Sequence, residues 1–440
     1  MQQSDILTEL PNVLSCIILQ EWLNLKCVVV TDSAYCSTIL RKNFLKILHS
    51  EEYFVREDIV LPTSFDLSFL LKFGNKLRSV VLKKKFTSTQ CYNIIENCKN
   101  LKNIQYYSQH CTYEIWNILP ANPLLESLTV IAHNTTIPSF AEVRLPKLRA
   151  LRLSGFRIED EQVVEALKMS SNILQLDLSG CRLLPNTLMG IGHLYPHLKS
   201  LGLGYMPMAL TDDILGNITA HCIGIVHLDI ENAQTISDQG ILAVARNLSG
   251  LRSLNIRYND LLTDNALVYL CTHCASTLHT LHICKQTHRP NQYSHTAIEQ
   301  LMLDCTQLRE LRYEDWILPV DRSIFNYSAL RNLTTLSIEF SNLTEPQLAA
   351  IAQHATNLRR ISTSLSEDTT VTDDRIEPVR VYTGLVHFIT GFPKLRELYL
   401  MYGYPSACKT SLEAFKEARP EVRVYVNVPH LHYDLLKMEI

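Results

Sequence analysis

Residues 251–271 read LRSLNIRYNDLLTDNALVYLC. Leu254 and Ile256 alternate with polar residues, which is the period-2 pattern of a short strand with one buried face. Thr263 then provides a helix N-cap, and the apolar residues from Ala266 onward recur at helical spacing. This stretch therefore predicts a unit that consists of a strand, a turn and a helix.

The same apolar-x-x-apolar-x-apolar pattern recurs along the chain, and most copies begin 23 to 27 residues apart. The copies begin at Leu77, Leu101, Leu125, Leu148, Ile173, Leu198, Ile225, Leu251, Leu278, Leu308, Leu333, Leu358 and Leu395, and a degenerate last copy contains Val424 and Val426. One unit of this size cannot bury both its strand face and its helix face, so the copies, about 14 in all, must stack. We therefore predict an α/β solenoid, a curved horseshoe with a parallel concave sheet and convex helices.

The motif L-x-x-L-x-L, followed by Cys or a polar residue, then I/L-T/S-D and a helix that ends near a Cys, resembles the cysteine-containing subclass of leucine-rich repeats. The residues that carry the resemblance are Leu176, Leu178, Cys181, Leu262, Thr263 and Asp264, and the helix-end cysteines Cys98, Cys222, Cys274 and Cys305. This resemblance covers residues 77–426 and implies the leucine-rich-repeat fold. It also implies a function, because proteins of this subclass are frequently F-box substrate receptors of cullin-type ubiquitin ligases, in which an N-terminal F-box binds a Skp-type adaptor.

The N-terminal segment 10–25 reads LPNVLSCIILQEWLNL, with a Pro at the first helical position and an apolar stripe at helical spacing. It resembles the opening of an F-box, whereas residues 28–33, VVVTDS, depart from the F-box pattern. The alternative is that residues 1–76 form only a cap that shields the first repeat. On the resemblance, the residues that face the adaptor are Leu10, Pro11, Leu14, Ile17, Ile18 and Trp22.

The repeat pattern also predicts the organisation of the chain. We expect an F-box-like helical region at 1–50, a linker and N-terminal cap at 51–76, the leucine-rich-repeat array at 77–426 and a C-terminal tail at 427–440. Two spacings are longer than the rest and leave surplus residues at 288–295 and 364–381. Insertions in such arrays map to loops that either take part in binding or are simply tolerated, and both alternatives stay open here.

Polar residues two, four and often six places after each repeat start should lie on the concave face, because side chains alternate across a strand. A concave surface of this kind suits a protein partner with charged groups, although a merely solvated strand face would have the same pattern. The predicted substrate contacts are Asp177, His227, Asp229, Glu231, Asn255, Arg257, His282, Arg312, Glu314 and Tyr399.

Composition limits the other functions. The formal net charge is −3 with 19% charged residues, which argues against a nucleic-acid or acidic-membrane partner. No apolar stretch reaches the length of a membrane span, and the N-terminus has no basic region or cleavage site of a secretory signal, so we expect a cytoplasmic or nuclear protein. In such a reducing compartment the 13 cysteines should stay free thiols.

We find no phosphate-binding, dinucleotide-binding or serine-hydrolase motif in the chain. Cys271, Cys274, His282 and Cys284 have a spacing that resembles a zinc site, but the repeat register places the first two on a helix and the others on a strand. We therefore predict no cofactor, no metal and no enzymatic activity. The predicted function is a protein-interaction module, the substrate-recognition subunit of a cullin-type ubiquitin ligase; the alternative is a scaffold or inhibitor similar to ribonuclease inhibitor, without a ligase role.

Overall fold

The computed structural model describes residues 42, 59–60, 74–82, 87–108, 119–132, 143–155, 158–284, 293–314, 326–343, 345–365, 391–400 and 409–426. The chain divides into two compact units, Met1–Leu176 and Asp177–Ile440. The predicted F-box-like region lies outside the described residues except for Lys42, and the predicted C-terminal tail lies outside them entirely. The same holds for the 364–381 insertion beyond Leu365.

The first unit contains a sheet whose strands are parallel and follow the chain order. A short strand already lies within the segment expected to be linker and cap, because Ile59 pairs with Val80. Strand β6 (Gln175–Asp177) crosses the boundary to the second unit. The other elements are β1 (Ile59–Val60), η1 (Gly74–Lys76), β2 (Ser79–Leu82), α6 (Ser88–Asn97), β3 (Asn103–Ser108), η2 (Leu119–Ala121), β4 (Ser127–Ala132), β5 (Ala150–Ser154) and α8 (Asp160–Leu167).

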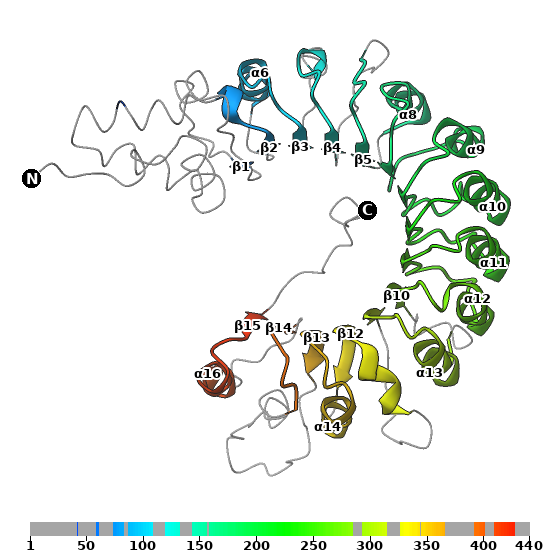
Figure 1. The fold of residues 1–440 in the computed structure, drawn as a ribbon, viewed down its shortest axis with the longest axis vertical. Coiled ribbons are helices and arrows are strands. Elements are labelled where there is room, and N and C mark those ends of the chain that lie inside the picture. The colour runs from blue at the N-terminus through cyan, green and yellow to red at the C-terminus, as the bar shows by residue number, and fades with distance from the viewer. Residues whose placement is uncertain are drawn as a thin grey trace, which may run out of the picture. The chain divides into compact units, whose positions relative to one another are not determined.

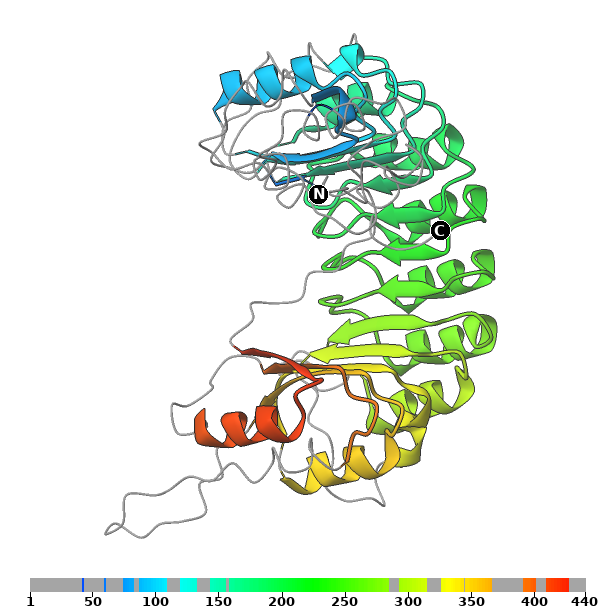
Figure 2. The ribbon, with the colours of Figure 1, turned by 60° about the vertical axis from the view of Figure 1, so that its left-hand side comes forward.

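The second unit repeats the same strand and helix alternation, with its helices on the outer side of the strands (Figure 1). The turned view shows the strands of this unit lying one beside the next (Figure 2). Its elements are α9 (Pro185–Leu194), β7 (Ser200–Gly202), α10 (Asp212–His221), β8 (His227–Asp229), α11 (Asp238–Asn247), β9 (Ser253–Asn255), α12 (Asp264–Cys274), β10 (Thr280–Cys284), α13 (His295–Asp304), β11 (Glu310–Glu314), η3 (Tyr327–Asn332), β12 (Thr335–Leu343), α14 (Glu345–His354), β13 (Arg360–Leu365), β14 (Glu397–Leu400), α16 (Lys409–Ala418) and β15 (Arg423–Val426).

The register of the second unit's sheet matches the repeat pattern residue by residue. All its neighbouring strands pair in parallel, and the second apolar residue of each predicted copy lies opposite that of the next. The residues in this row are Leu201, Leu228, Leu254, Leu281, Leu311, Leu336, Ile361, Leu398 and Val424. The predicted α/β leucine-rich-repeat solenoid is therefore confirmed, down to its degenerate last copy.

The core lies between the strands and the helices. The leucines that begin a copy and those within its strand are almost fully buried: Leu251, Leu254 and Ile256 are each at most 1% exposed. Full burial of one such side chain stabilises the fold by about 1.5–3 kcal/mol before chain entropy is counted. Since each copy shares this core only with its neighbours, stability comes from stacking.

Hydrogen bonds link the helix N-termini of successive repeats. Ser237 is the N-cap that precedes α11, and its hydroxyl accepts a hydrogen bond from the backbone N–H of Gln239 (3.2 Å). Ser237 also donates twice to Asp212 of the preceding repeat, from its backbone N–H (2.9 Å) and from its hydroxyl (2.5 Å). Thr263 donates in the same way to Asp238, at 2.8 and 2.6 Å. In each Thr-Asp or Ser-Asp pair, the Thr or Ser therefore caps its own helix, and the Asp that follows it accepts hydrogen bonds from the next repeat.

The helix-end cysteines make a similar connection at the opposite end of the helices. The thiol of Cys222 donates to the carbonyl oxygen of Tyr195 in the preceding repeat (3.2 Å). The thiol of Cys274 likewise lies 3.8 Å from the carbonyl oxygen of Ala245. Burial raises the pKa of Cys222 to about 11, so this thiol keeps its proton. Helix carbonyls that lack a partner within their own helix thus find one in the next repeat.

We predict that Gly240→Ala destabilises the protein, although Gly to Ala inside a helix normally stabilises it by about 1 kcal/mol. A Cβ at position 240 would lie 2.3 Å from Asp212 Oδ1, the oxygen that accepts from Ser237. Loss of that bridge should lower the free energy of unfolding by about 1–2 kcal/mol in urea denaturation followed by circular dichroism.

Gly190→Ala in α9 is the matched control for Gly240→Ala, because nothing lies within 4 Å of a Cβ at position 190. It should raise the free energy of unfolding by up to about 1 kcal/mol. Stabilisation by both substitutions would show that the Asp212 bridge contributes nothing.

Candidate functional site

The predicted contact residues lie on the sheet face opposite the leucines, which we call the polar sheet face. Within the second unit, they follow the strands from β6 to β14, and Glu231 and Arg257 come two residues after β8 and β9. Most of them are buried, with at most 8% of the residue exposed; Arg312 and Tyr399 are half-buried. The buried members are Asp177, His227, Asp229, Glu231, Asn255, Arg257, His282 and Glu314.

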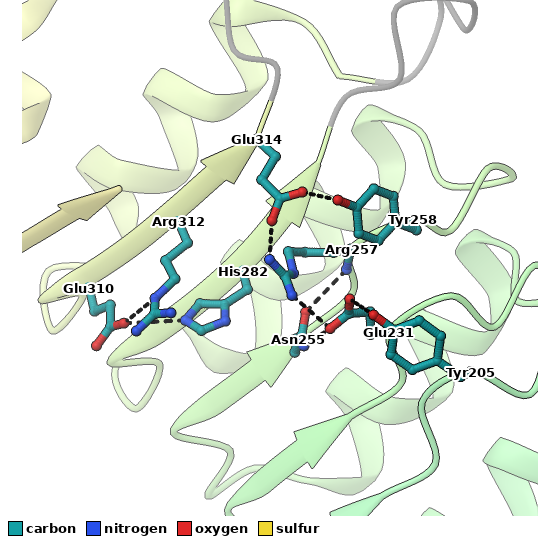
Figure 3. A network of polar contacts seen from close by, with 9 residues as sticks. All are labelled: Tyr205, Glu231, Asn255, Arg257, Tyr258, His282, Glu310, Arg312 and Glu314. Atoms are coloured by element: carbon teal, nitrogen blue, oxygen red, sulfur yellow. Dashed lines mark hydrogen bonds and ion pairs between the residues drawn. The ribbon is translucent and has the colours of Figure 1, made fainter. Parts of the chain in front are cut away.

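Arg257 is the centre of a buried polar network on this face (Figure 3). Its guanidinium forms ion pairs with two carboxylates, with Glu231 at 2.8 Å and with Glu314. The side chains of these three residues are 7%, 5% and 2% exposed, so the pairs are shielded from water. Asn255 donates from Nδ2 to the same Glu231 oxygen that binds Arg257, at 2.9 Å. Four predicted contacts are therefore brought together, from three different repeats.

Two tyrosines that the sequence patterns do not single out complete the network. Tyr205 donates from its hydroxyl to Glu231 (2.6 Å), and Tyr258 donates to Glu314. Both have left-handed backbones, with φ of 59° and 57°, which are uncommon for bulky residues. They occupy the same place, seven residues after a repeat start, and Asn232 shares it with a φ of 54°. Only this equal spacing could have indicated them.

The network fixes the charges of its members. Burial opposes ionisation of Glu231, but the Arg257 guanidinium and the hydrogen bonds from Tyr205 and Asn255 outweigh it and lower the pKa of Glu231. Burial also opposes the charge of Arg257, yet its two carboxylate partners raise the pKa of the guanidinium. For Tyr258, burial and the hydrogen bond to Glu314 both raise the phenol pKa. One buried cation thus faces two buried anions.

A second cluster lies next to it on β10 and β11. Arg312 pairs with Glu310 at 2.7 Å, and Nε2 of His282 lies 3.3 Å from the same Glu310 oxygen. Burial lowers the pKa of His282 to about 4, more than the hydrogen bond with Glu310 raises it. His282 is therefore neutral at physiological pH. Glu310 was absent from the predicted contacts, although the rule of two places after a repeat start applies to it.

Asp229 is the unusual carboxylate of this face. Burial raises the pKa of Asp229 to about 8, and the nearby negative charges of Glu231 and Asp177 act in the same direction. The backbone N–H of Glu231, which donates to Asp229 Oδ1 at 2.9 Å, only partly offsets them. Asp229 thus holds a proton at neutral pH and can act as a hydrogen-bond donor.

Tyr399 stands apart from both clusters. Its ring stacks on Tyr425 of the last strand, with the ring centroids 4.5 Å apart and an interplanar angle of 11°. Both rings are half-buried. This pair offers an accessible aromatic surface, of the kind enriched at protein interfaces.

Metal and membrane features are absent from the described part of the chain. No group of three or more His, Cys, Asp or Glu side chains is placed to hold a metal ion among these residues. No helix within the described ranges is long and apolar enough to cross a bilayer. The predicted adaptor residues Leu10, Pro11, Leu14, Ile17, Ile18 and Trp22 all lie outside the described residues.

No family model matches the chain. Among solved structures, it is similar to a chain of the yeast Rad7–Elc1 complex, with 16% identity, a TM-score of 0.51 and coverage of 94% of this chain and 91% of that chain. It is also similar to TLR13 from the TLR13–ssRNA13 complex, with 15% identity, a TM-score of 0.50 and coverage of 88% of this chain and 58% of that chain. LegL7 from Legionella pneumophila is 12% identical, with a TM-score of 0.38 over 70% of this chain and 90% of that chain.

The chain spans less than two thirds of the TLR13 chain that it matches. At identities of 15–16% these similarities concern the fold alone. Together with the repeat register and the polar sheet face, they define the class of protein: a leucine-rich-repeat protein.

We predict that the free energy of unfolding falls between about pH 6.5 and 8. Folded Asp229 has a pKa of about 8 and binds its proton more tightly than the unfolded residue, whose pKa is 3.8. Its contribution to the free energy of unfolding is therefore fully present below pH 3.8 and is lost as the pH rises from 3.8 through 8. His282 has the opposite sign, because its pKa falls from 6.5 to about 4 on folding and its contribution is lost as pH drops from 6.5 to 4. The two offset each other below pH 6.5, and Asp229 acts alone above it.

The substitution Asp229→Asn tests this assignment. It should remove the alkaline decrease, which is about 1.4 kcal/mol per pH unit at most, and leave the acidic loss from His282 uncompensated. Urea unfolding at a series of pH values measures both limbs, and Asp213→Asn, which removes an exposed carboxylate of α10, is the control. If Asp229→Asn keeps the wild-type profile, Asp229 is not the protonated group.

Proposed function

We propose that this protein is an interaction module that binds a protein partner on the polar sheet face of its second unit. The buried Arg257 network supports this, because it holds the polar side chains in one arrangement before any partner arrives. A face that is already ordered loses less conformational entropy on binding. The accessible groups of this face include aromatic and cationic side chains: Tyr205 is 39% exposed, the Arg360 side chain is 40% exposed, and the Tyr399–Tyr425 pair is half-buried.

We further propose that the module is the substrate-recognition subunit of a cullin-type ubiquitin ligase and has no enzymatic activity itself. In this proposal residues 10–25 bind a Skp-type adaptor, and the polar sheet face binds the substrate. The F-box-like sequence supports the first part. The fold is compatible with such an assembly, because the yeast chain that it resembles was crystallised in a complex of two proteins, Rad7 and Elc1.

The partner-binding face is tested with the double substitution Tyr399→Ala and Tyr425→Ala. Removal of the stacked rings should weaken retention of the partner about tenfold or more, because buried tyrosines are frequent hot spots of interfaces. Quantitative affinity purification of the full chain from cells, with the retained proteins measured by mass spectrometry, gives the ratio.

The control for this face is the double substitution Leu194→Ala and Val268→Ala on the helices α9 and α12, where each side chain is about half exposed (52%). It should leave partner retention unchanged. A partner that is lost with the helix variant but kept with the tyrosine variant would place binding on the helix side instead.

The ligase assignment is tested with Leu14→Asp and Ile18→Asp, which put two charges into the predicted adaptor stripe. We expect the full chain to lose co-purification with a Skp-type adaptor and a cullin but to keep its substrate. Gln20→Asp, outside the stripe, is the control. A wild-type chain that never retains the adaptor, but forms a stable complex with a partner, would favour the scaffold or inhibitor function over the ligase function.

A further inference from the structure

A cationic pocket lies in the second unit, away from the Arg257 network. It has a volume of about 180 Å³, below the roughly 300–1,000 Å³ of sites for drug-sized ligands, and so suits a small chemical group. The pocket contains three cationic side chains, two amides, one hydroxyl and no carboxylate. Its lining residues are Arg309, Asn332, Thr334, Asn357, Arg359 and Lys394.

The residues that line this pocket occupy equivalent places in successive repeats. Its lining residues come directly before or directly after the first apolar residue of a copy, where the chain passes from a helix to the next strand. Backbone hydrogen bonds hold these turns together: the N–H of Thr334 donates to Arg309 O, and that of Arg359 donates to Thr334 O, both at 2.8 Å. Side chains from successive repeats are therefore presented side by side.

The three cations have no carboxylate partner within the described residues. Arg309 donates to the carbonyl oxygens of Thr306 (2.8 Å) and Leu308 (3.1 Å), and Lys394 donates to Asn357 Oδ1 (2.7 Å). Arg359 is exposed and makes no side-chain hydrogen bond or ion pair in that part of the chain. Like charges gathered without an anion repel one another, so an anionic ligand would stabilise the arrangement.

Two other basic residues of the sheet are paired with a carboxylate. In the first unit, Lys102 follows a repeat start just as Arg309 and Arg359 do, and it pairs with Glu126 of the next repeat at 2.5 Å. Arg360, next to Arg359 in the chain, pairs with Glu397 at 2.6 Å. A neighbouring repeat can therefore provide a carboxylate that neutralises a cation at this edge. No carboxylate lines the pocket, so its three cations are not neutralised in this way.

We propose that this pocket binds a phosphate monoester, namely the side chain of a phosphorylated serine or threonine of a partner protein. A monoester carries nearly two negative charges and three strong acceptor oxygens at one point, which match three cations and additional amide donors. A nucleic-acid backbone carries one charge per phosphate and needs a longer basic track. That the phosphate belongs to a protein rests on the proposed interaction function; binding of a phosphate monoester does not.

The test uses fluorescence anisotropy of the full chain with a labelled, degenerate peptide library that contains one phosphoserine. The unmodified library, inorganic phosphate and oligouridylate serve as comparisons and competitors. The wild-type chain should bind the phosphorylated library, ignore the unmodified one and release its ligand to inorganic phosphate. Arg359→Gln and Lys394→Met should each weaken binding about tenfold, and Arg359→Lys should weaken it less.

Arg396→Gln is the matched control, because Arg396 is an exposed cation at the same place in the next repeat but does not line the pocket. It should change affinity less than about twofold. The proposal would be overturned if Arg359→Gln, Lys394→Met and Arg396→Gln all weakened binding equally. Equal binding of both libraries, or tighter binding of oligouridylate, would also overturn it. The Tyr399→Ala, Tyr425→Ala variant should still bind the phosphorylated library, so failure of the polar sheet face and failure of the pocket can be distinguished.

Discussion

The parallel register is the constraint on which this structure depends. Each copy must place its second apolar residue beside that of the next copy, as Leu254 lies between Leu228 and Leu281. A slip of one residue would turn every leucine of that strand to the polar face. Once the register is fixed, equivalent positions of all copies form rows, with neighbouring strands about 4.8 Å apart. The chemistry of every face then depends on which residues follow one another in a row.

The buried charges are a consequence of these rows. In the row six places after the repeat start, Glu231, Arg257, Cys284 and Glu314 follow one another. Cys284 lies opposite Glu314, and because it is small, Arg257 can extend past it to that carboxylate. Buried ion pairs of this kind add little net stability, since desolvation consumes most of the attraction. Their main effect here is to leave the polar face a single arrangement.

The repeat phase, the strand register and the helix caps could be predicted from the sequence, because each depends on contacts within one copy or between equivalent places. Thr263 illustrates this, since the same dipeptide that caps its helix also bridges to the neighbouring repeat. The pairing of Arg257 with Glu314 could not be predicted, because it skips a repeat. The roles of Tyr205 and Tyr258 depend on left-handed backbones that no pattern within one copy indicates, and only their equal place after the repeat start could have indicated them. Alternation predicts which face a side chain lies on, but not whether it is accessible.

The two ends of the helices differ in charge, and this difference explains where each kind of interaction occurs. At the helix N-termini, aspartates such as Asp212 and Asp238 meet hydroxyl and N–H donors of the next repeat, so their charges serve the stacking itself. At the opposite edge, where helices lead into strands, the backbone ladder already satisfies the peptide groups. Some side chains at that edge, such as Lys102 and Glu126, still pair between repeats, whereas Arg359 has no ion pair within the described residues. In our proposal this cation therefore meets a ligand from outside the repeat.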